Sequence, residues 1–481
     1  MTVPCLLAID AGTGSVRAVL FDAAGHALAQ ASRAVDVKNG DIRSEIDPHQ
    51  LWASLISALR EVTAGGRSIA AIGITAALGT ILTTRNGDPL TPILTWQDRR
   101  AVIEAETIRT RIGAETLISI TGRRADAELT AARLLWFATH APQILDRAEC
   151  VLTLKDWLVL KLTGEIVTDP ASASYSLLFN VFEGAWSQPL IDGLGIDNAL
   201  LPAVRAADAV AGTLSSEFAF ETGLAAGIPV VTGGPDGTVG VIGGGLTRPG
   251  VAVDVMGTTD VIFACTDICP DAGDGALVIN TYPANRLWSI GGPMAATGGL
   301  LNWMARLLKT SIADLIEAAA RIKPGCDGLM VFPNLAGSRA PRWNLAERGR
   351  ISGLSFDHDG AHLFRAALEG TAYEIASTFA ALNARGIVPR EIRAVGGGTE
   401  NVLWMDIRAA VLNTPLIVPE VIEASSLGSA MLAAVGIGLY NNLDEAGRAM
   451  IRIARQVDPR MDLVRTYADL RPRWLHERES G

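Results

Sequence analysis

The chain has 481 residues, of which 49% are hydrophobic and 19% are charged, and its formal net charge is −10. Such a chain can bury large cores, which excludes a disordered protein, and its acidic charge disfavours a surface for nucleic acid or anionic membranes. The 49 glycines follow no period of three, so collagen is excluded and many tight turns are indicated.

The cysteines and the start of the chain concern its cellular setting. Five cysteines are scattered along the sequence, and the close pair Cys265 and Cys269 lacks the spacing of a zinc site. Residues 1–10 do not resemble a signal peptide, and no run of 18 apolar residues occurs. We therefore expect a cytoplasmic protein with reduced thiols and with no nucleic-acid or membrane partner. A homodimer is compatible with the sequence.

Three short strands are expected near the N-terminus. Apolar or alternating runs cover 5–9, 15–21 and 26–31, and the turns 10–14 and 22–25 separate them. Two consecutive hairpins of this kind predict a three-stranded antiparallel start.

A helix is expected next. Asp47 is placed to cap it, Pro48 suits its first position, and Gln50 completes a capping-box pattern. The apolar run 69–75 predicts a buried strand, and 99–111 predicts a second helix.

The second half of the chain repeats this order after a junction at 246–250. A strand, a Gly/Thr turn and a second strand come first, and a strand that runs through three glycines into a helix comes later. These segments are 251–256, 257–260 and 261–264, followed by 392–395, 396–398 and 399–412. Because strand 228–232 also runs into a glycine turn, each half ends on the same kind of unit. This order predicts two α/β domains of similar fold, 1–245 and 246–481.

The turn Asp10-Ala11-Gly12-Thr13-Gly14-Ser15 is the first candidate binding motif. Backbone N–H groups and hydroxyls in such a turn can hold phosphate oxygens, and the Asp10 carboxylate suits Mg²⁺, which prefers oxygen ligands. A plain hairpin turn with Asp10 as a local cap is the alternative. A Walker A loop is excluded because no Gly-Lys pair occurs, and a Rossmann fingerprint is disfavoured because Arg17 stands where its third glycine would be.

Two glycine turns in the second half are further candidates. Gly257-Thr258-Thr259-Asp260 offers the same device as the first turn, so one hairpin from each half would clamp the phosphates of one nucleotide. Gly396-Gly397-Gly398 lets the backbone approach a flat ligand, and Asn401 offers both a donor and an acceptor. Ordinary turns are the alternative at both places.

Two segments carry side chains suited to an acceptor molecule. Asp236 in GGPDG lies where a strand end turns into a helix, so it is either an N-cap or a general base that reaches a substrate hydroxyl. Trp96 and Asp98 in WQDRR suit a polyhydroxy ligand, because the ring stacks on C–H faces and the charged group binds hydroxyls. The alternative places Trp96 in the core and Asp98 at the cap of the next helix.

Together these motifs make the chain resemble the FGGY carbohydrate kinase family from about residue 6 to residue 440. The resemblance begins with the opening LLAIDAGTGSVRAVLFD and continues through two signature regions and an adenosine region. These are LTLKDWLVLKLTGEIVTD (152–169), GLMVFPNLAGSRAPRW (328–343) with GRISGLSFDHDGAHLFRAALEGTAYE (349–374), and GGGTENVLWMDIRAAVLNTPLIVPE (396–420) with EASSLGSAMLAAVG (423–436).

The resemblance implies an α/β fold of two actin-like ATPase (ribonuclease H-like) domains with an interdomain cleft. The first domain would hold the sugar and the catalytic base, and the second, with a C-terminal helical tail, would hold ATP. The resemblance implies ATP and Mg²⁺ as cofactors. It also implies γ-phosphoryl transfer to a hydroxyl of a small sugar or polyol, foremost a ketopentose (pentulose).

The resemblance further implies a role for each matching residue. Asp236 takes the role of the catalytic base, and Asp10 lies near the metal. Phosphate and ATP contacts fall on Thr13, Gly14, Ser15, Arg17, Gly257, Thr258, Thr259, Gly298, Gly396, Gly397, Gly398 and Asn401. Substrate contacts fall on Leu78, Trp96, Asp98 and Asp236.

The sequence departs from the family pattern in two places, which leaves the particular sugar open. Xylulokinases have Met-His-Gly where this chain reads Ala77-Leu78-Gly79, and Gly237 follows Asp236 where the family commonly has a polar residue. WQDRR resembles the glycerol kinase version as much as the xylulokinase version. The alternative function is an actin-like nucleotide-binding protein or sugar sensor without phosphoryl transfer, which the two signature regions disfavour.

Overall fold

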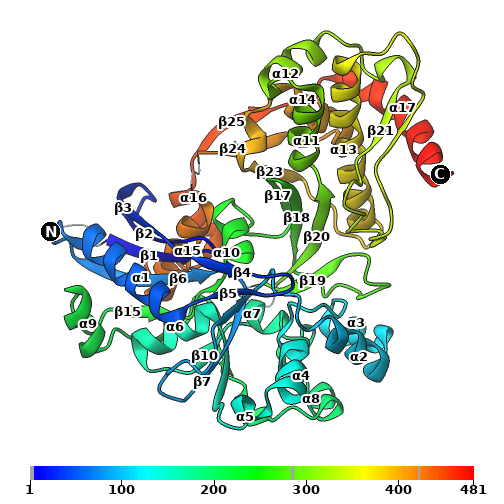
Figure 1. The fold of residues 1–481 in the computed structure, drawn as a ribbon. Coiled ribbons are helices and arrows are strands. Elements are labelled where there is room, and N and C mark those ends of the chain that lie inside the picture. Colours follow the sequence, from blue (N-terminus) through cyan, green and yellow to red (C-terminus); the bar gives the residue numbers. More distant parts are fainter. Residues whose placement is uncertain (1–4, 283–286, 421–422, 481) are drawn as a thin grey trace.

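The computed structural model describes residues 5–282, 287–420 and 423–480 as two α/β halves, each built on a seven-stranded sheet (Figure 1). The first sheet has the order β14-β15-β6-β1-β2-β3, and β16 pairs with the end of β6. Its strands are β1 (Cys5–Ala11), β2 (Ser15–Phe21), β3 (Ala27–Ala34), β6 (Ile69–Ala76), β14 (Val210–Thr213), β15 (Pro229–Val231) and β16 (Gly234–Pro235). The predicted three-stranded start is confirmed, and β1 is buried along its whole length.

The second sheet has the order β19-β20-β18-β17-β23-β24-β25. Its strands are β17 (Val251–Met256), β18 (Thr259–Thr266), β19 (Val278–Thr281), β20 (Trp288–Ala296), β23 (Glu391–Val395), β24 (Leu416–Pro419) and β25 (Ile453–Val457). β17 pairs antiparallel with β18 and parallel with β23, just as β1 pairs antiparallel with β2 and parallel with β6. The predicted repeat of one strand order in both halves is therefore confirmed.

Short strands make up the remaining sheets. β4 (Val37–Asn39), β5 (Ser44–Ile46), β8 (Ile93–Thr95), β7 (Gly79–Thr83) and β9 (Cys150–Thr153) form one sheet in that order. Two-stranded pairs join β10 (Val167–Thr168) to β13 (Ala203–Val204), β11 (Phe179–Asn180) to β12 (Ala185–Trp186), and β21 (Met330–Phe332) to β22 (Arg350–Ser352).

Helices cover both large sheets. In the first half they are α1 (Pro48–Thr63), α2 (Val102–Ile112), α3 (Ala114–Thr121), α4 (Thr130–His140), α5 (Pro142–Leu145), α6 (Leu154–Thr163), α7 (Pro170–Ser174), α8 (Gln188–Leu194), α9 (Ser216–Thr222) and α10 (Asp236–Gly243). Later come α11 (Gly298–Leu308), α12 (Ile312–Ala320), α13 (Gly360–Asn383), α14 (Val402–Leu412), α15 (Ala424–Gly436), α16 (Leu443–Met450) and α17 (Met461–Glu479). Among the described residues, no helix is long and apolar enough to cross a bilayer.

Helix α15 joins the two halves, although it comes late in the chain. It packs against β1 and β6 of the first sheet and against α10, and Figure 1 shows it beside them. Small residues allow this approach: a Cβ on Gly428 would lie 2.1 Å from the carbonyl oxygen of Val239, and a Cβ on Gly73 would lie 2.1 Å from that of Ser429. The core around α15 also takes side chains from β17 and β18. A helix of the expected second domain thus packs against the first sheet.

Local geometry differs from the expected helix starts in two places. Asp47 caps α1 by accepting from His49 N at 2.9 Å, but Gln50 donates to Asp36 instead of closing a capping box. The glycine turn after β23 continues as a 3₁₀ turn, and α14 starts only after Asn401, whose side chain accepts from Trp404 N at 3.0 Å. Asn401 is therefore a helix cap, with one side-chain nitrogen left over.

Candidate active site

Asp10 and Asp236 lie at the same edge of the first sheet. In the parallel register, Thr75 of β6 pairs with Asp10 of β1 on one side and with Gly234 of β16 on the other. The Thr75 hydroxyl donates to the carbonyl oxygen of Gly234 at 2.9 Å, which fixes the segment leading to Asp236, the first residue of α10. Parallel strands end at a common edge, so the two carboxylates face the same region. Open α/β sheets bind their ligands at this edge, outside the carboxyl ends of the strands.

The charge of Asp236 acts on Asp10. Burial and that charge, with a smaller contribution from Glu423, together raise the pKa of Asp10 to about 7, and Arg17 opposes the shift. Burial also raises the pKa of Asp236, although the Gly237 N–H donates to its side chain at 2.6 Å. Two carboxylates that repel each other at a buried edge are suited to a hard cation, which takes oxygen ligands. Asp10 would be the residue that holds Mg²⁺ there.

The charge of Asp10 should make the stability of the metal-free protein depend on pH. Its pKa in the folded state lies above the value of an unfolded aspartate, so the folded state binds more protons between about pH 4 and pH 7, and stability falls as the pH rises through that window. We expect wild type to lose about 2–3 kcal/mol more unfolding free energy than Asp10→Asn between about pH 5 and pH 8. Urea unfolding at both pH values, with a chelator present, measures this; parallel pH profiles for the two proteins would contradict it.

The first glycine turn lies beside the tryptophan expected to bind substrate. Trp96 is 44% exposed, and its Nε1 donates to the Thr13 hydroxyl at 3.2 Å. The backbone turn closes through Gly12 N, which donates to the carbonyl oxygen of Ser15 at 2.9 Å. Thr13, Gly14 and Ser15 thus form a turn tip that Trp96 flanks.

Arg17 has a partner inside the protein. Its Nη1 lies 2.6 Å from Glu423 Oε2, just before α15, so the ion pair ties the first hairpin to that helix. The expected role of Arg17 at the phosphates therefore has a competing structural explanation, since the guanidinium is already engaged.

The second glycine turn packs tightly against the start of α11. The N–H groups of Thr297 and Gly299 donate to the carbonyl oxygen of Thr258 at 3.2 and 2.9 Å. A Cβ on Gly298 would lie only 2.3 Å from the carbonyl oxygen of Gly257. Gly298, expected to contact ATP, is thus required for the contact between the turn 257–258 and α11.

Alanine at Gly298 should weaken nucleotide use. The methyl group would push the turn away from α11, and displacing a binding turn by a fraction of an ångström is expected to lower kcat/KM for ATP about tenfold or more. Sugar binding measured without nucleotide should stay unchanged, because the first domain is untouched. Gly65→Ala is the matched control, since its added Cβ meets nothing within 4 Å. Initial rates at varied ATP concentration test this; a Gly298→Ala enzyme with the kinetics of the control would refute it.

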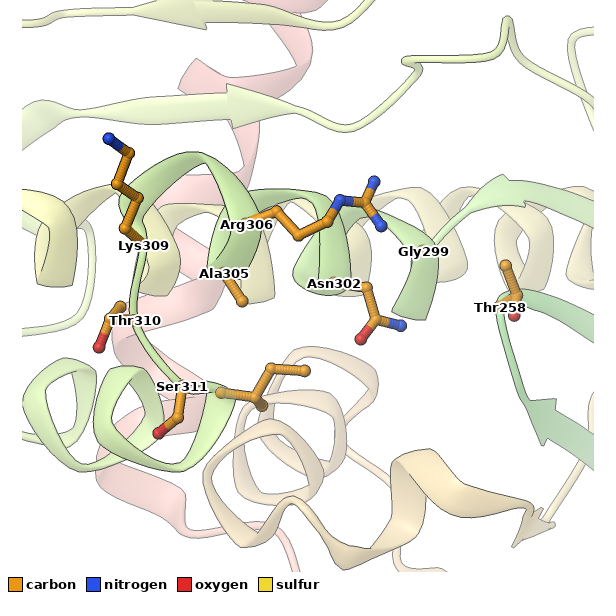
Figure 2. Close-up of a pocket in the computed structure, with 9 residues that line it drawn as sticks. Thr258, Gly299, Asn302, Ala305, Arg306, Lys309, Thr310 and Ser311 are labelled. Carbon is orange, nitrogen blue, oxygen red and sulfur yellow. The ribbon is translucent and has the colours of Figure 1, made fainter.

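A pocket of about 830 Å³ opens beside this turn. Figure 2 shows Thr258 and Asn302 at one side of it and the segment from Lys309 to Ser311 at the other. Arg306 and Lys309 also line it and bring two positive charges to the region. The sequence analysis did not predict a role for Asn302, Arg306 and Lys309. Their spacing along a helix that follows a glycine turn is the one sequence signal that could have indicated a place in the pocket lining.

The third glycine turn meets the second at the end of β17. Gly396 has a φ of +96°, and a Cβ there would lie 2.7 Å from the carbonyl oxygen of Met256, so glycine is needed. The Nδ2 group of Asn401 is buried and has no partner among the described residues. A buried amide donor without an acceptor is costly, so it fits a ligand such as the base of ATP. The structure thus brings Gly257–Thr259, Gly298, Gly396–Gly398 and Asn401 together.

A buried ion network supports the second turn from behind. Arg408 on α14 is fully buried and contacts Asp254 of β17 at 2.5 Å and Asp260 of β18 at 2.6 Å. Asp260 also accepts from the Thr297 hydroxyl at 2.6 Å. The network therefore fixes both strands of the hairpin, the residue before Gly298 and the helix that Asn401 caps. These charged residues were also missed, because isolated Asp and Arg residues in a sequence do not show which of them will meet.

The expected substrate residues do not all face the same space. Leu78 is partly buried in the bend between β6 and β7, and Trp96 is exposed. Asp98 has no exposed surface: it accepts from Ser44 N at 2.9 Å and pairs with Arg100 at 2.8 Å. Burial opposes its ionisation, but the hydrogen bonds from Arg100 and Ser44 lower its pKa overall.

The position of Asp98 corrects two expectations. It is a buried brace inside the first half, so a direct substrate contact is not supported. It is not the cap of α2 either, because that helix starts after Ala101 without a side-chain cap. The exposure of Trp96 likewise rules out the alternative that placed this ring in the core.

Comparison with known proteins identifies the fold and the family. Two α/β halves of one strand order form the actin-like fold that solved carbohydrate kinases share with this chain. The chain belongs to the FGGY family of carbohydrate kinases: its N-terminal domain model matches residues 5–243 and its C-terminal domain model matches 252–437. It is accordingly a carbohydrate kinase, a phosphotransferase with an alcohol group as acceptor, and the predicted fold class and enzyme class are confirmed.

Relatives and solved structures are similar along the whole chain. A glycerol kinase of Acidovorax ebreus (strain TPSY) is 32% identical over 498 residues and covers 98% of both chains. Among solved structures, the xylulose kinase from Rhodospirillum rubrum has a TM-score of 0.93 at 28% identity and covers 99% of this chain and 98% of its own. Plasmodium falciparum glycerol kinase with ADP has a TM-score of 0.89 at 22% identity, covers 99% of this chain and 98% of its own, and shares the fold.

Proposed function

We propose that this kinase transfers the γ-phosphoryl group of ATP to a primary hydroxyl of a small polyol or ketose, with Asp236 as the general base. The observation that carries the proposal is the position of Asp236, at the start of α10 on the sheet edge that also holds Asp10. Its raised pKa makes it a stronger base than an ordinary carboxylate. The proposed setting is the cytoplasm.

In the proposed reaction, Asp236 takes the proton of the acceptor hydroxyl as that oxygen attacks the phosphorus. Phosphoryl transfer has a loose transition state, so positioning and charge stabilisation supply most of the rate. The turns at Thr13–Ser15 and Gly257–Thr259 would donate backbone N–H groups to the phosphates, and Asn401 would meet the base. Mg²⁺ bound near Asp10 would neutralise phosphate charge.

The acceptor is proposed as a neutral polyol or ketose in the range from glycerol to the ketopentoses. The relatives named above are glycerol kinases, and the solved structures include xylulose kinases, so both ends of that range have support. Leu78 offers no polar side chain where xylulokinases have a histidine, and Gly237 offers none where the family commonly has a polar residue. A ketopentose therefore remains one member of the range, and the expected preference for it is open to test.

The test is ADP release from ATP and Mg²⁺ with a panel of ketopentoses, pentitols, tetritols and glycerol. A carbohydrate kinase with this site should release ADP only when an acceptor is present, and the phosphorylated product should appear in equal amount. Sugar-independent ATP turnover, or tight ATP binding with no transfer to any member of the panel, would favour the nucleotide-binding sensor instead.

A further inference from the structure

The loop between α3 and α4 brings an arginine into an unusual environment. Arg123 is 6% exposed, and its guanidinium carbon lies 4.0 Å from the ring centre of Tyr175. Its Nη2 donates to the Asn280 side chain on β19, but its Nε is buried and has no partner among the described residues. A buried N–H donor without an acceptor is costly unless a ligand supplies one.

Glu128 in the same loop is the complementary group. Its side chain is partly buried, and no hydrogen bond or ion pair joins it to another described residue. Burial raises its pKa, the charge of Asp126 raises it further, and Arg133, Arg123 and Arg99 act in the opposite direction. The loop therefore presents a spare acceptor that interacts electrostatically with the Arg123 guanidinium, which carries the spare donor.

The charges of Glu128 and Asp236 both act on Tyr175. Tyr175, on which Arg123 stacks, ends α7, and Asp169 at the start of α7 lies 3.5 Å from the position of a Cβ on Gly234, two residues before the base. Burial raises the pKa of Tyr175, Arg123 lowers it, and the negative charges of Glu128 and of Asp236 raise it. The tyrosine is thus within electrostatic reach of the loop and of the base.

We propose that Arg123, Glu128 and Tyr175 bind the non-reacting hydroxyls of the acceptor, and that the opposite charges of Arg123 and Glu128 select a neutral polyol or ketose over a sugar acid. This inference rests on the proposed function and specifies its substrate site. A hydroxyl can donate and accept, so a vicinal diol satisfies both spare groups: one hydroxyl donates to the Glu128 carboxylate and its neighbour accepts from Arg123 Nε. A substrate carboxylate would instead face Glu128, Asp236 and Asp10. The combined negative charge of these three groups exceeds the single positive charge of Arg123, so the carboxylate would be repelled.

The experiment is calorimetric titration of the full chain, without nucleotide, by glycerol, a tetritol, a pentitol, a ketopentose and the aldonate of the same pentose. Glu128→Gln and Arg123→Met should each weaken the neutral ligand that wild type binds best by about 10- to 100-fold, the loss expected for one charged hydrogen bond. Glu128→Gln should also improve aldonate binding relative to the neutral ligand. Thermal unfolding of each variant identifies one that does not fold. The affinity of the other variant for the neutral ligand then decides whether the proposal holds.

Two controls separate substrate binding from packing between the halves. Arg124 is the exposed neighbour of Arg123 and donates to the carbonyl oxygen of Asp274 at 3.0 Å, so Arg124→Ala removes a similar contact outside the subsite and should leave sugar binding unchanged. Asn280→Ala removes the bond that Arg123 makes to β19 but keeps the guanidinium. If Asn280→Ala weakened binding as much as Arg123→Met, Arg123 would act through the interface and the proposal would fail.

The outcomes distinguish the subsite from the proposed function. Wild-type affinities in both Glu128→Gln and Arg123→Met overturn the subsite, even if the enzyme phosphorylates polyols. Failure of the wild type to bind any neutral member of the panel overturns it as well. Acceptor binding that both substitutions weaken, without phosphoryl transfer in the ADP assay, supports the binding role of Arg123 and Glu128 and contradicts the proposed kinase reaction.

Discussion

Replacing Asp236 with Asn is expected to lower kcat about 10²- to 10⁴-fold, with little change in the KM for the acceptor. The amide keeps the shape of the side chain and the hydrogen bond from Gly237 N at 2.6 Å, but it cannot take the proton of the attacking hydroxyl. The raised pKa of Asp236 also predicts that kcat falls on the acid side at a higher pH than for an ordinary carboxylate. Coupled-assay rates from acid to alkaline pH would show this limb in wild type and its loss in the variant.

Asp208→Asn is the matched control for that substitution. Asp208 is another partly buried carboxylate of the first half; burial raises its pKa, and neither Asp10 nor Asp236 acts on it. This variant should retain about the wild-type kcat, because no reacting group is changed. An Asp236→Asn enzyme that kept full acceptor-dependent activity would show that Asp236 is not the base.

The features that could be predicted from the sequence are those encoded locally. The short apolar run 5–9, the turn 10–14 and the alternating run 15–21 predict a hairpin, and the GGPDG turn predicts that Asp236 lies where a strand end turns into a helix. The echo of the hairpin at 251–264 likewise followed from strand and turn chemistry alone. Each of these depends on neighbours within a few residues, so the chain itself carries the signal.

The features that escaped prediction depend on contacts between distant residues. Arg17 and Glu423 are 406 positions apart, and nothing near either residue predicts their ion pair. α15 has the composition of a buried helix, yet the sequence does not say that it packs against the sheet formed by residues from the opposite end of the chain. Asp98 was misjudged for the same reason, because Ser44, which donates to its carboxylate, belongs to a different strand.

Replacing Arg408 with Met is expected to destabilise the protein by about 3–5 kcal/mol, because it leaves Asp254 and Asp260 as buried charges without their partner. The guanidinium is fully buried and stacks at 3.9 Å on Trp404, so water cannot replace it without opening the core. Urea unfolding at neutral pH measures the loss. Arg321→Met is the control: Arg321 forms an exposed pair with Glu317, which is expected to contribute little.

The pH dependence of that loss separates charge from packing. Burial raises the pKa of Asp254 to about 7 and Arg408 opposes the shift, so removing Arg408 raises this pKa further. A carboxyl group with a raised pKa in the folded state destabilises the fold as the pH rises above its unfolded value. Arg408→Met should therefore cost much less at about pH 5, where Asp254 is protonated in both proteins, than at about pH 8. Adding Asp254→Asn and Asp260→Asn should recover part of the loss, since the isosteric amides carry no charge. A loss that is equal at both pH values and unaffected by the two amides would show that Arg408 acts by filling space. The position of the second glycine turn, at Gly257 and Thr258, would then need another explanation.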